Sequence, residues 1–346
     1  MGIRRLANEL RLSIGTVSRA LNDRPDVNPE TRARVKEAAE RAGYVPNQSG
    51  RSLRSGRTGI VAAIIPSHGA AREYDAGLFM ILEGVRRTLQ RGSLDLIVLF
   101  RGNEEDPLAN LQRIVQRRIA DSVIVSQTLP SDPRLAWMQA TGVEFVALGR
   151  SAGLADYPFV DFDFEAVGAE IVRLFVRDGH RRLAVTVAES RVNYESLLLQ
   201  TMRAEASRLG LGAGAVSALP CADGRLTQAA CAALAAPQAE TPTAILVSHE
   251  GIAFGLYDEL ARLGRRVGPD VSVVCTFPAV AARGLTPSLS HFEADLDAVG
   301  AALAESLLAL LPDAPAEAAA APRARLVPLR FVSRDSHQPA AARVTG

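Results

Sequence analysis

The first 45 residues place apolar side chains at helical spacing in three short segments. The first segment is IRRLANEL, residues 3–10. In the second, IGTVSRAL, the side chains of Val17, Ala20 and Leu21 lie on one side of the predicted helix. A helix of about eight residues is not stable alone in water. The short segments must therefore pack against one another.

Capping residues support the same division of the first 45 residues into three helices. Ser13 is a good N-cap for the second helix, and Asn28 is one for the third. Pro29 then takes the first helical position, and Gly43 ends the pattern. The apolar stripe of the third helix consists of Val35, Ala38, Ala39 and Ala42. We predict three helices around one small core.

From Gly59 onward, strand-like apolar runs alternate with amphipathic helical runs. The strand-like runs are IVAAII, LDLIVLF, DSVIVS, VEFVAL, RLAVTV, AILVS and VSVVC. The helical runs include residues 77–91, 165–178, 194–209, 250–263 and 295–311. This alternation predicts an α/β body of parallel sheets covered on both faces. About ten strands fit two doubly wound lobes better than one.

Three segments lie outside this alternation. Gly, Ser and Arg dominate PNQSGRSLRSGRTG, residues 46–59, which is the composition of a linker. The Ala/Pro segment at 312–324 indicates a loop or tether, and we expect the tail after Ser336 to be disordered.

The composition is that of an ordinary globular protein, with 48% hydrophobic and 22% charged residues among 346. No apolar run approaches the roughly 20 residues that span a bilayer. The N-terminus is charged and lacks a signal-peptide core, so we expect a cytoplasmic protein with no membrane partner. Cys221, Cys231 and Cys275 are too widely spaced for a disulfide framework or a zinc site, and we expect them in the core.

The overall charge of +1 conceals an asymmetry. Residues 1–57 hold 12 Arg and Lys against 6 Asp and Glu, so this part is basic and the remainder is mildly acidic. A small basic head indicates contact with a polyanion.

Signatures of enzymes are missing from the sequence. It contains no GxSxG nucleophile elbow, P-loop or HExxH motif, and GLGAG at 210–214 lacks the GxGxxG spacing. The five histidines are dispersed. We therefore expect no catalytic residues, no metal and no cofactor.

A family resemblance rests on LANELRLSIGTVSRALNDRPDVNPETRARVKEAAERAGYVPNQSGRSLRSGRTG. This stretch closely resembles the head of the lac repressor family (LacI/GalR-type) of bacterial transcription regulators. In the body, GHRRLAVT, PTAILVSHEGIAFGLYDEL, RVGPDVSVV and LTPSLSHF stand at the family's order and spacing, and PLRFVSRDS resembles its final strand. The resemblance covers nearly the entire chain, and a head, hinge and body in this order are highly specific.

The resemblance implies a helix-turn-helix DNA-binding head at 1–45, a hinge at 46–58 and a two-lobed, periplasmic-binding-protein-like body at 59–336. The body would bind the effector and dimerise. Its N-lobe would comprise 59–158 and 292–322, its C-lobe 159–291 and 323–336, with a tail at 337–346.

The predicted helix at 14–21 would then be a recognition helix, whose small residues let it enter a major groove. By the family pattern Ile14, Gly15 and Arg19 occupy base-reading positions. The guanidinium fork of Arg19 matches guanine O6 and N7, whereas Gly15 offers no side chain. The other implied DNA-binding residues are Ser13, Thr16, Ser18, Asn22, Asn28, Thr31, Tyr44, Asn47, Arg51 and Leu53.

In the family, the linker folds into a short hinge helix on DNA and wedges a leucine into the minor groove, a place that Leu53 matches. An apolar wedge unstacks a base step and bends the duplex. Gly50 departs from the alanine usual there and costs about 1 kcal/mol of helix propensity.

Ligands of open parallel sheets bind beyond the carboxyl ends of the strands, so the effector site is expected between the lobes. The candidates are His68, Tyr74, Phe79, Gln127, Arg150, Arg191, Asn193, Tyr194, His249, Glu250 and Phe277. Aromatic and polar groups of this kind suit a sugar or related polyol. The sequence departs from the family at three places here. Leu198 stands where family members have an arginine that anchors the effector. His249 and Glu250 stand in place of an Asn-Asp pair, and Phe277 stands in place of an aspartate.

These observations predict a homodimeric, sequence-specific repressor that binds a near-palindromic operator and is released by a small carbohydrate. One alternative is a co-repressed or activating regulator that responds to a non-sugar metabolite. A second is a sugar-binding protein without DNA function, against which the added head argues.

Overall fold

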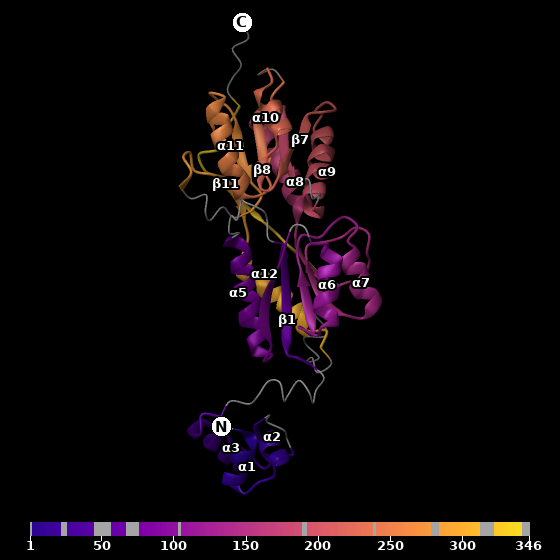
Figure 1. The fold of residues 1–346 in the computed structure, drawn as a ribbon. Coiled ribbons are helices and arrows are strands. Elements are labelled where there is room, and N and C mark those ends of the chain that lie inside the picture. Colours follow the sequence, from indigo (N-terminus) through magenta and orange to yellow (C-terminus); the bar gives the residue numbers. More distant parts are fainter. Residues whose placement is uncertain are drawn as a thin grey trace. The chain divides into compact units, whose positions relative to one another are not determined.

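The structure is a computed structural model that describes residues 2–21, 26–44, 57–66, 76–102, 105–188, 192–237, 240–277, 284–311 and 322–340. The chain divides into two compact units, Met1–Thr58 and Gly59–Gly346 (Figure 1). The first unit is the head, and the second is the two-lobed body.

The described residues of the head form three helices, as the sequence predicted: α1 (Ile3–Leu10), α2 (Ile14–Leu21) and α3 (Pro29–Arg41). The predicted caps are confirmed, because Thr16 N donates to Ser13 Oγ at 3.0 Å and Glu30 N donates to Asn28 Oδ1 at 2.8 Å. The shared core consists of Leu6, Ala7, Val17, Ala20, Val27, Val35, Ala38 and Ala39. Each short helix is thus stabilised by its neighbours.

In the N-lobe, the described strands form a six-stranded sheet in the order β12-β5-β4-β3-β1-β2, and all neighbours are parallel. The strands are β1 (Ile60–Pro66), β2 (Asp95–Arg101), β3 (Ser122–Val125), β4 (Glu144–Leu148), β5 (Phe159–Phe162) and β12 (Ala324–Val327). The helices are α5 (Ala76–Arg91), α6 (Pro107–Gln116), α7 (Pro133–Thr141) and α12 (Leu296–Leu308). Helices α5 and α12 cover one face, and α6 and α7 cover the other (Figure 1).

In the C-lobe, seven described strands lie in the order β13-β11-β10-β9-β6-β7-β8. They are β6 (Leu183–Ala188), β7 (Val216–Ala222), β8 (Arg225–Leu226), β9 (Ala244–Val247), β10 (Ser272–Cys275), β11 (Ser290–Glu293) and β13 (Arg330–Val332). Only the two edge strands of this described sheet, β8 and β13, run antiparallel to their neighbours. The helices are α8 (Phe164–Arg177), α9 (Asn193–Arg208), α10 (Gln228–Ala235) and α11 (Glu250–Arg262). The expected doubly wound lobes are therefore present.

In the part of the chain that the structure describes, three passages connect the lobes, after β5, after β11 and after β12. Because β5 and β12 both pair within the N-lobe sheet, the first and third passages follow Phe162 and Val327. The boundaries predicted from the sequence lie one short strand earlier, at 158/159 and 322/323. A four-residue strand does not reveal by its own pattern which of two sheets it joins.

Helices α5 and α12 approach each other closely at two glycines. A Cβ on Gly84 would collide with the backbone carbonyl of Asp297 on α12. A Cβ on Gly300 would collide with the carbonyl oxygen of Ile81 and lie 2.8 Å from Val85 N. Only glycine permits this distance between the two backbones.

The segment after Ser336 differs from the expected disordered tail as far as residue 340. Ser336 is fully buried, and Gln338 N donates to Ser272 Oγ at 3.0 Å. His180 makes ring hydrogen-bond contacts of 3.0 Å with Thr243 Oγ1 and with the Gln338 carbonyl. These hydrogen bonds hold the segment on the C-lobe, and its polar composition did not reveal them.

Candidate functional site

Helix α2 presents one exposed face to its surroundings. Val17 and Ala20 are fully buried in the head core, while Ile14 is 43% exposed and the Arg19 side chain is 54% exposed. The face therefore joins an apolar side chain, a glycine backbone at Gly15 and a cation. That combination suits the edges of bases in a major groove.

Ser18 does not belong to this exposed face. It is only 7% exposed, because α2 packs against α1 and α3 over a wide arc that includes it. The hydroxyls of Ser13 and Thr16 lie 2.9 Å apart in the cap of α2, and Ser13 is exposed. Ser18 is therefore buried in the head, and its expected contact with a phosphate stays a prediction.

The other predicted DNA contacts divide into two groups. Asn28 is exposed at the cap of α3, Thr31 is half-buried on that helix, and Tyr44 packs partly against the head core. The predicted contacts that lie outside the described residues are Asn22, Asn47, Arg51 and Leu53, together with Gly50.

In the body, the predicted effector residues Tyr194 and Phe277 meet in an aromatic cluster. Their ring centroids are 5.6 Å apart, and both rings contact Phe164, at 4.9 and 5.6 Å. Phe162, at the end of β5 in the N-lobe, lies 5.4 Å from Phe277. The cluster therefore joins the two lobes at a place where the chain passes between them.

Arg150 also connects the lobes. Its Nε donates to Asp161 Oδ2 at 2.8 Å, and its Nη2 donates to Glu165 Oε2 on α8 at 2.5 Å. Burial raises the pKa of Asp161 to about 6, although the contacts with Arg150 oppose that shift. The guanidinium of Arg150 thus contacts two carboxylates, and the expected binding of effector by Arg150 stays a prediction.

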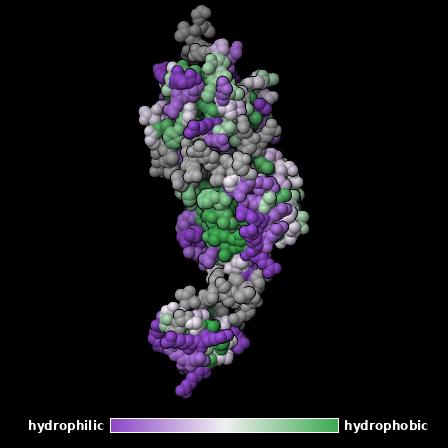
Figure 2. All heavy atoms as spheres, in the orientation of Figure 1, coloured by the Kyte–Doolittle hydropathy of each residue, from purple (hydrophilic) through white to green (hydrophobic). Residues whose placement is uncertain are grey.

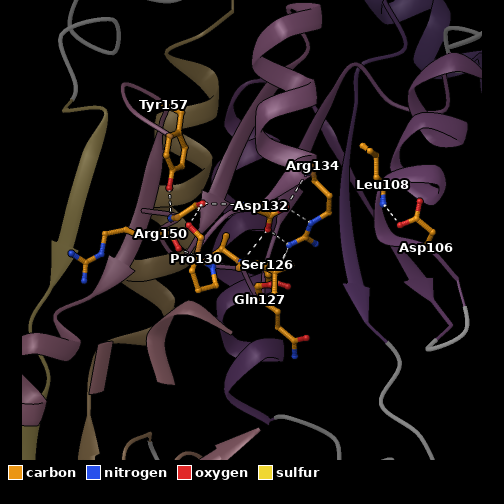
Figure 3. A network of polar contacts seen from close by, with 12 residues as sticks. Asp106, Leu108, Ser126, Gln127, Pro130, Asp132, Arg134, Arg150 and Tyr157 are labelled. Carbon is orange, nitrogen blue, oxygen red and sulfur yellow. Dashed lines mark hydrogen bonds and ion pairs between the residues drawn. The ribbon is translucent and has the colours of Figure 1, made fainter. Parts of the chain in front are cut away.

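Gln127 lies on a rigid turn after β3. Its φ of 51° is left-handed, and Arg134 Nη2 donates to the carbonyls of Ser126 and Gln127 at 3.1 Å each. Arg134 also forms a buried ion pair of 2.7 Å with Asp132. Figure 3 shows the Gln127 side chain pointing away from this network. The turn therefore holds Gln127 while leaving its side chain outside the network.

The carboxylate of Asp132 organises the same turn. It accepts hydrogen bonds from Leu129 N and Arg134 N at 3.1 and 3.0 Å. Burial raises the pKa of Asp132, but its hydrogen bonds and the charge of Arg134 outweigh burial and hold the pKa below its ordinary value. The carboxylate is therefore ionised at neutral pH.

The turn touches the C-lobe through Thr128, whose carbonyl oxygen accepts from Asn193 N at 2.7 Å. Asn193 is 5% exposed, so this predicted effector residue lies buried at a contact between the lobes. Thr128 Oγ1 also donates to the Arg150 carbonyl at 2.7 Å. Thr128 therefore connects Arg150 of the N-lobe with Asn193 of the C-lobe.

His249 and Glu250 stand at the start of α11, after β9, and both are half-buried. Phe79 is 52% exposed on α5 beside Met80, which is 47% exposed. His68, Tyr74 and Arg191 lie outside the described residues. Leu198, the residue in place of the family's arginine, is fully buried in the core.

Glu195 was not predicted from the sequence; its carboxylate lies in the first turn of α9 and is 1% exposed. It accepts from Ala188 N at 2.7 Å and from the Tyr194 hydroxyl at 3.4 Å. Burial raises its pKa, and these hydrogen bonds oppose the shift. Its position on the third residue of a helix that follows a buried strand was the available signal.

Metal and thiol chemistry find little support in the part of the chain that the structure describes. No group of three or more His, Cys, Asp or Glu residues within it could hold a metal ion. Cys221 and Cys275 are buried, and burial raises the pKa of Cys221 to about 12. Among the described helices, none combines the length and the apolar character that crossing a bilayer requires.

Two family models match the chain. Residues 5–47 match "Bacterial regulatory proteins, lacI family", and residues 172–337 match "Periplasmic binding protein-like domain". AglR, an HTH-type transcriptional regulator of Rhizobium meliloti (strain 1021), is 29% identical over 89% of this chain and 87% of its own. Matches to three further regulators span 50–54% of those proteins.

Two solved structures share the fold over almost the whole chain. The lac repressor dimer bound to operator and the anti-inducer ONPF has a TM-score of 0.79 at 20% identity, covering 98% of this chain and 99% of that one. The complex of the regulator CelR with cellobiose has a TM-score of 0.70 at 22% identity, with coverages of 97% and 99%. The fold of this chain, head and body together, is therefore also the fold of these two proteins.

Proposed function

The chain belongs to the lacI family of bacterial regulatory proteins, and from this premise we propose that it is a homodimeric repressor that a small sugar-like effector releases from a near-palindromic operator. The family consists of DNA-binding transcriptional regulators rather than enzymes. The observation that carries the proposal is the exposed face of α2, with Ile14 and Arg19, on a basic head that has its own core. Acting on chromosomal DNA places the protein in the cytoplasm.

Selection from fragmented genomic DNA tests this function. The purified full-length protein should retain fragments that share a near-palindromic sequence, because two-fold protein symmetry requires two-fold DNA symmetry. Binding should weaken steeply with salt, since phosphate contacts dominate the affinity. Retention of unrelated fragments, or equal affinity for one half-site, would contradict the proposal.

Arg19→Ala is expected to cost roughly 1 to 3 kcal/mol of operator binding and to relax the preference at one base pair of each half-site. The reason is the exposed position of Arg19 on α2. Binding titrations on the operator and its single-base variants measure the change. An equal loss on random DNA would show that Arg19 contacts only phosphate.

The dimer is supported by an apolar strip on the N-lobe. Phe79 and Met80 on α5 and Val98 and Phe100 on β2 are 37–66% exposed, and β2 is an edge strand of the sheet. Figure 2 shows an apolar area on the N-lobe. Contiguous apolar surface of this kind marks an interaction site. A second copy of the chain would cover it symmetrically.

Phe100→Asp should therefore convert the dimer to monomers at concentrations where the unaltered protein is dimeric, because it places a charge in the apolar strip. Leu326→Asp is the matched control, since Leu326 is 48% exposed on β12 at the opposite edge of the sheet. Analytical ultracentrifugation distinguishes the species. Monomers with both variants, or with neither, would argue against the strip as the interface.

A carbohydrate effector is supported by the aromatic cluster of Tyr194 and Phe277 and by the polar groups of Gln127 and His249 beyond the strand ends. The structural neighbour CelR carries cellobiose in a body of the same fold. Leu198 is buried and Phe277 lies in the aromatic cluster. We therefore expect contacts with the effector that differ from those of family members with an arginine and an aspartate at these two positions. We propose a neutral sugar held between the lobes.

His249→Ala should abolish the response to effector while leaving operator binding by the free protein unchanged. Calorimetry of the full-length protein against sugars and other metabolites identifies a ligand, and anisotropy then measures operator affinity with and without it. Bound effector is expected to lower operator affinity by about 5- to 150-fold, and bound operator to lower effector affinity by the same factor. A gain in operator affinity would favour co-repression. A ligand without effect on operator affinity would defeat the mechanism.

A further inference from the structure

The position of Arg19 is defined by a neighbouring carboxylate. Arg19 Nε lies 3.6 Å from Asp26 Oδ2, across the segment that joins α2 to α3. Both side chains are more than half exposed, so the pair lies on the surface of the head. Nε is the guanidinium atom in contact with this carboxylate, and among the described residues no second carboxylate forms an ion pair with Arg19.

Asp26 is itself held in place by the residues that follow it. Val27 is 6% exposed in the head core, and its carbonyl accepts from Arg32 Nη2 at 3.1 Å. Asn28 then caps α3. The backbone on one side of Asp26 is therefore anchored to the core. An anchored carboxylate restricts an arginine more than one on a free loop does.

The far end of the same guanidinium lies over Gly15, one helical turn earlier. A Cβ placed on Gly15 would be 3.9 Å from Arg19 Nη2, which is ordinary van der Waals contact. A longer side chain at position 15 would compete for the space that Nη2 occupies. Arg19 is thus directed along the exposed face of α2, between Asp26 and Gly15.

We propose that Asp26 is a positioning residue for Arg19 and sets how strictly α2 discriminates its base pair. The proposal rests on the proposed role of Arg19 in DNA binding. DNA offers Arg19 two kinds of acceptor, the phosphates of the backbone and the edges of bases. Asp26 repels phosphates and, through its contact with Nε, orients the guanidinium, whose two terminal nitrogens form a fork that matches guanine O6 and N7.

The test compares full-length Asp26→Ala and Asp26→Asn with the unaltered dimer on two DNAs. One is the operator, and the other is the operator with the Arg19-dependent base pair replaced. Discrimination between them should fall roughly two- to five-fold per half-site, the range that an exposed ion pair supports. Affinity for random DNA should rise. Glu9→Ala removes an equal charge from the head and should leave discrimination unchanged.

A double-mutant cycle shows whether Asp26 acts through Arg19. In the Arg19→Ala background, Asp26→Ala should change discrimination no further. Unchanged discrimination with Asp26→Ala in the otherwise unaltered protein, or an equal loss in both backgrounds, would overturn the proposal. If Arg19→Ala alone leaves discrimination intact, the proposed base-reading role of Arg19 is wrong. This outcome is distinguishable from a result that contradicts only the role of Asp26. Thermal unfolding of each variant verifies that the head is folded.

Discussion

Gly300→Ala should lower the free energy of unfolding of the body by about 3 kcal/mol, because the new methyl group would meet backbone atoms that cannot turn aside. It would collide with the carbonyl oxygen of Ile81 and lie 2.8 Å from Val85 N and 3.0 Å from Gly84 Cα. The methyl group can be accommodated only if α12 moves away from α5. Urea unfolding followed by circular dichroism measures the loss.

Gly255→Ala is the matched control. Gly255 lies in the exposed part of α11, and a Cβ there would meet no atom within 4 Å. The same substitution should therefore raise stability by up to about 1 kcal/mol through helix propensity. Equal effects of the two substitutions would contradict the close packing of α5 on α12.

Arg134→Met should cost about 3 to 5 kcal/mol, since it leaves the Asp132 carboxylate buried without its cation. The side chains of the pair are 7% and 0% exposed. The substitution also removes the hydrogen bonds that hold the carbonyls of Ser126 and Gln127, so the effector response should be lost as well. Unfolding curves and operator titrations with effector measure the two effects.

The pH dependence of this loss identifies its cause. The folded state holds the pKa of Asp132 below its ordinary value of 3.8, so the carboxylate contributes stability above that pH and loses it as the pH falls further. The difference in the free energy of unfolding between Arg134→Met and the unaltered protein should therefore become smaller in acid. Arg266→Met, which breaks a largely exposed pair with Asp270, should lower the free energy of unfolding far less than Arg134→Met, because solvent screens the pair. A similar cost for both variants would contradict the role of burial.

The sequence was most informative where local chemistry determines the backbone. Ser13 and Asn28 cap their helices as predicted, and α2 has the predicted bounds. The alternating runs predicted both lobes, because a buried parallel strand and an amphipathic helix have different periods. These features depend on neighbours along the chain.

Features that depend on distant segments could not be predicted in this way. The rings of Phe162, Phe164, Tyr194 and Phe277 come from three separate stretches, and only the fold brings them together. Ser18 resembles a surface hydroxyl until the packing of the head is known. Arg150 was predicted to bind effector because its two carboxylate partners lie on other elements, and the sequence around Arg150 does not reveal them.

The third passage between the lobes has a consequence for synthesis of the chain. The N-lobe sheet is completed by β12, which pairs with β5 although about 165 residues separate their ends. At the roughly 5–20 residues per second of translation, the ribosome needs about 10 to 30 s to make that interval. The head is complete long before then, whereas α5 still lacks its partner α12. A chain shortened within this interval by a nonsense mutation would therefore keep all three head helices but lose the lobe that supports the apolar strip.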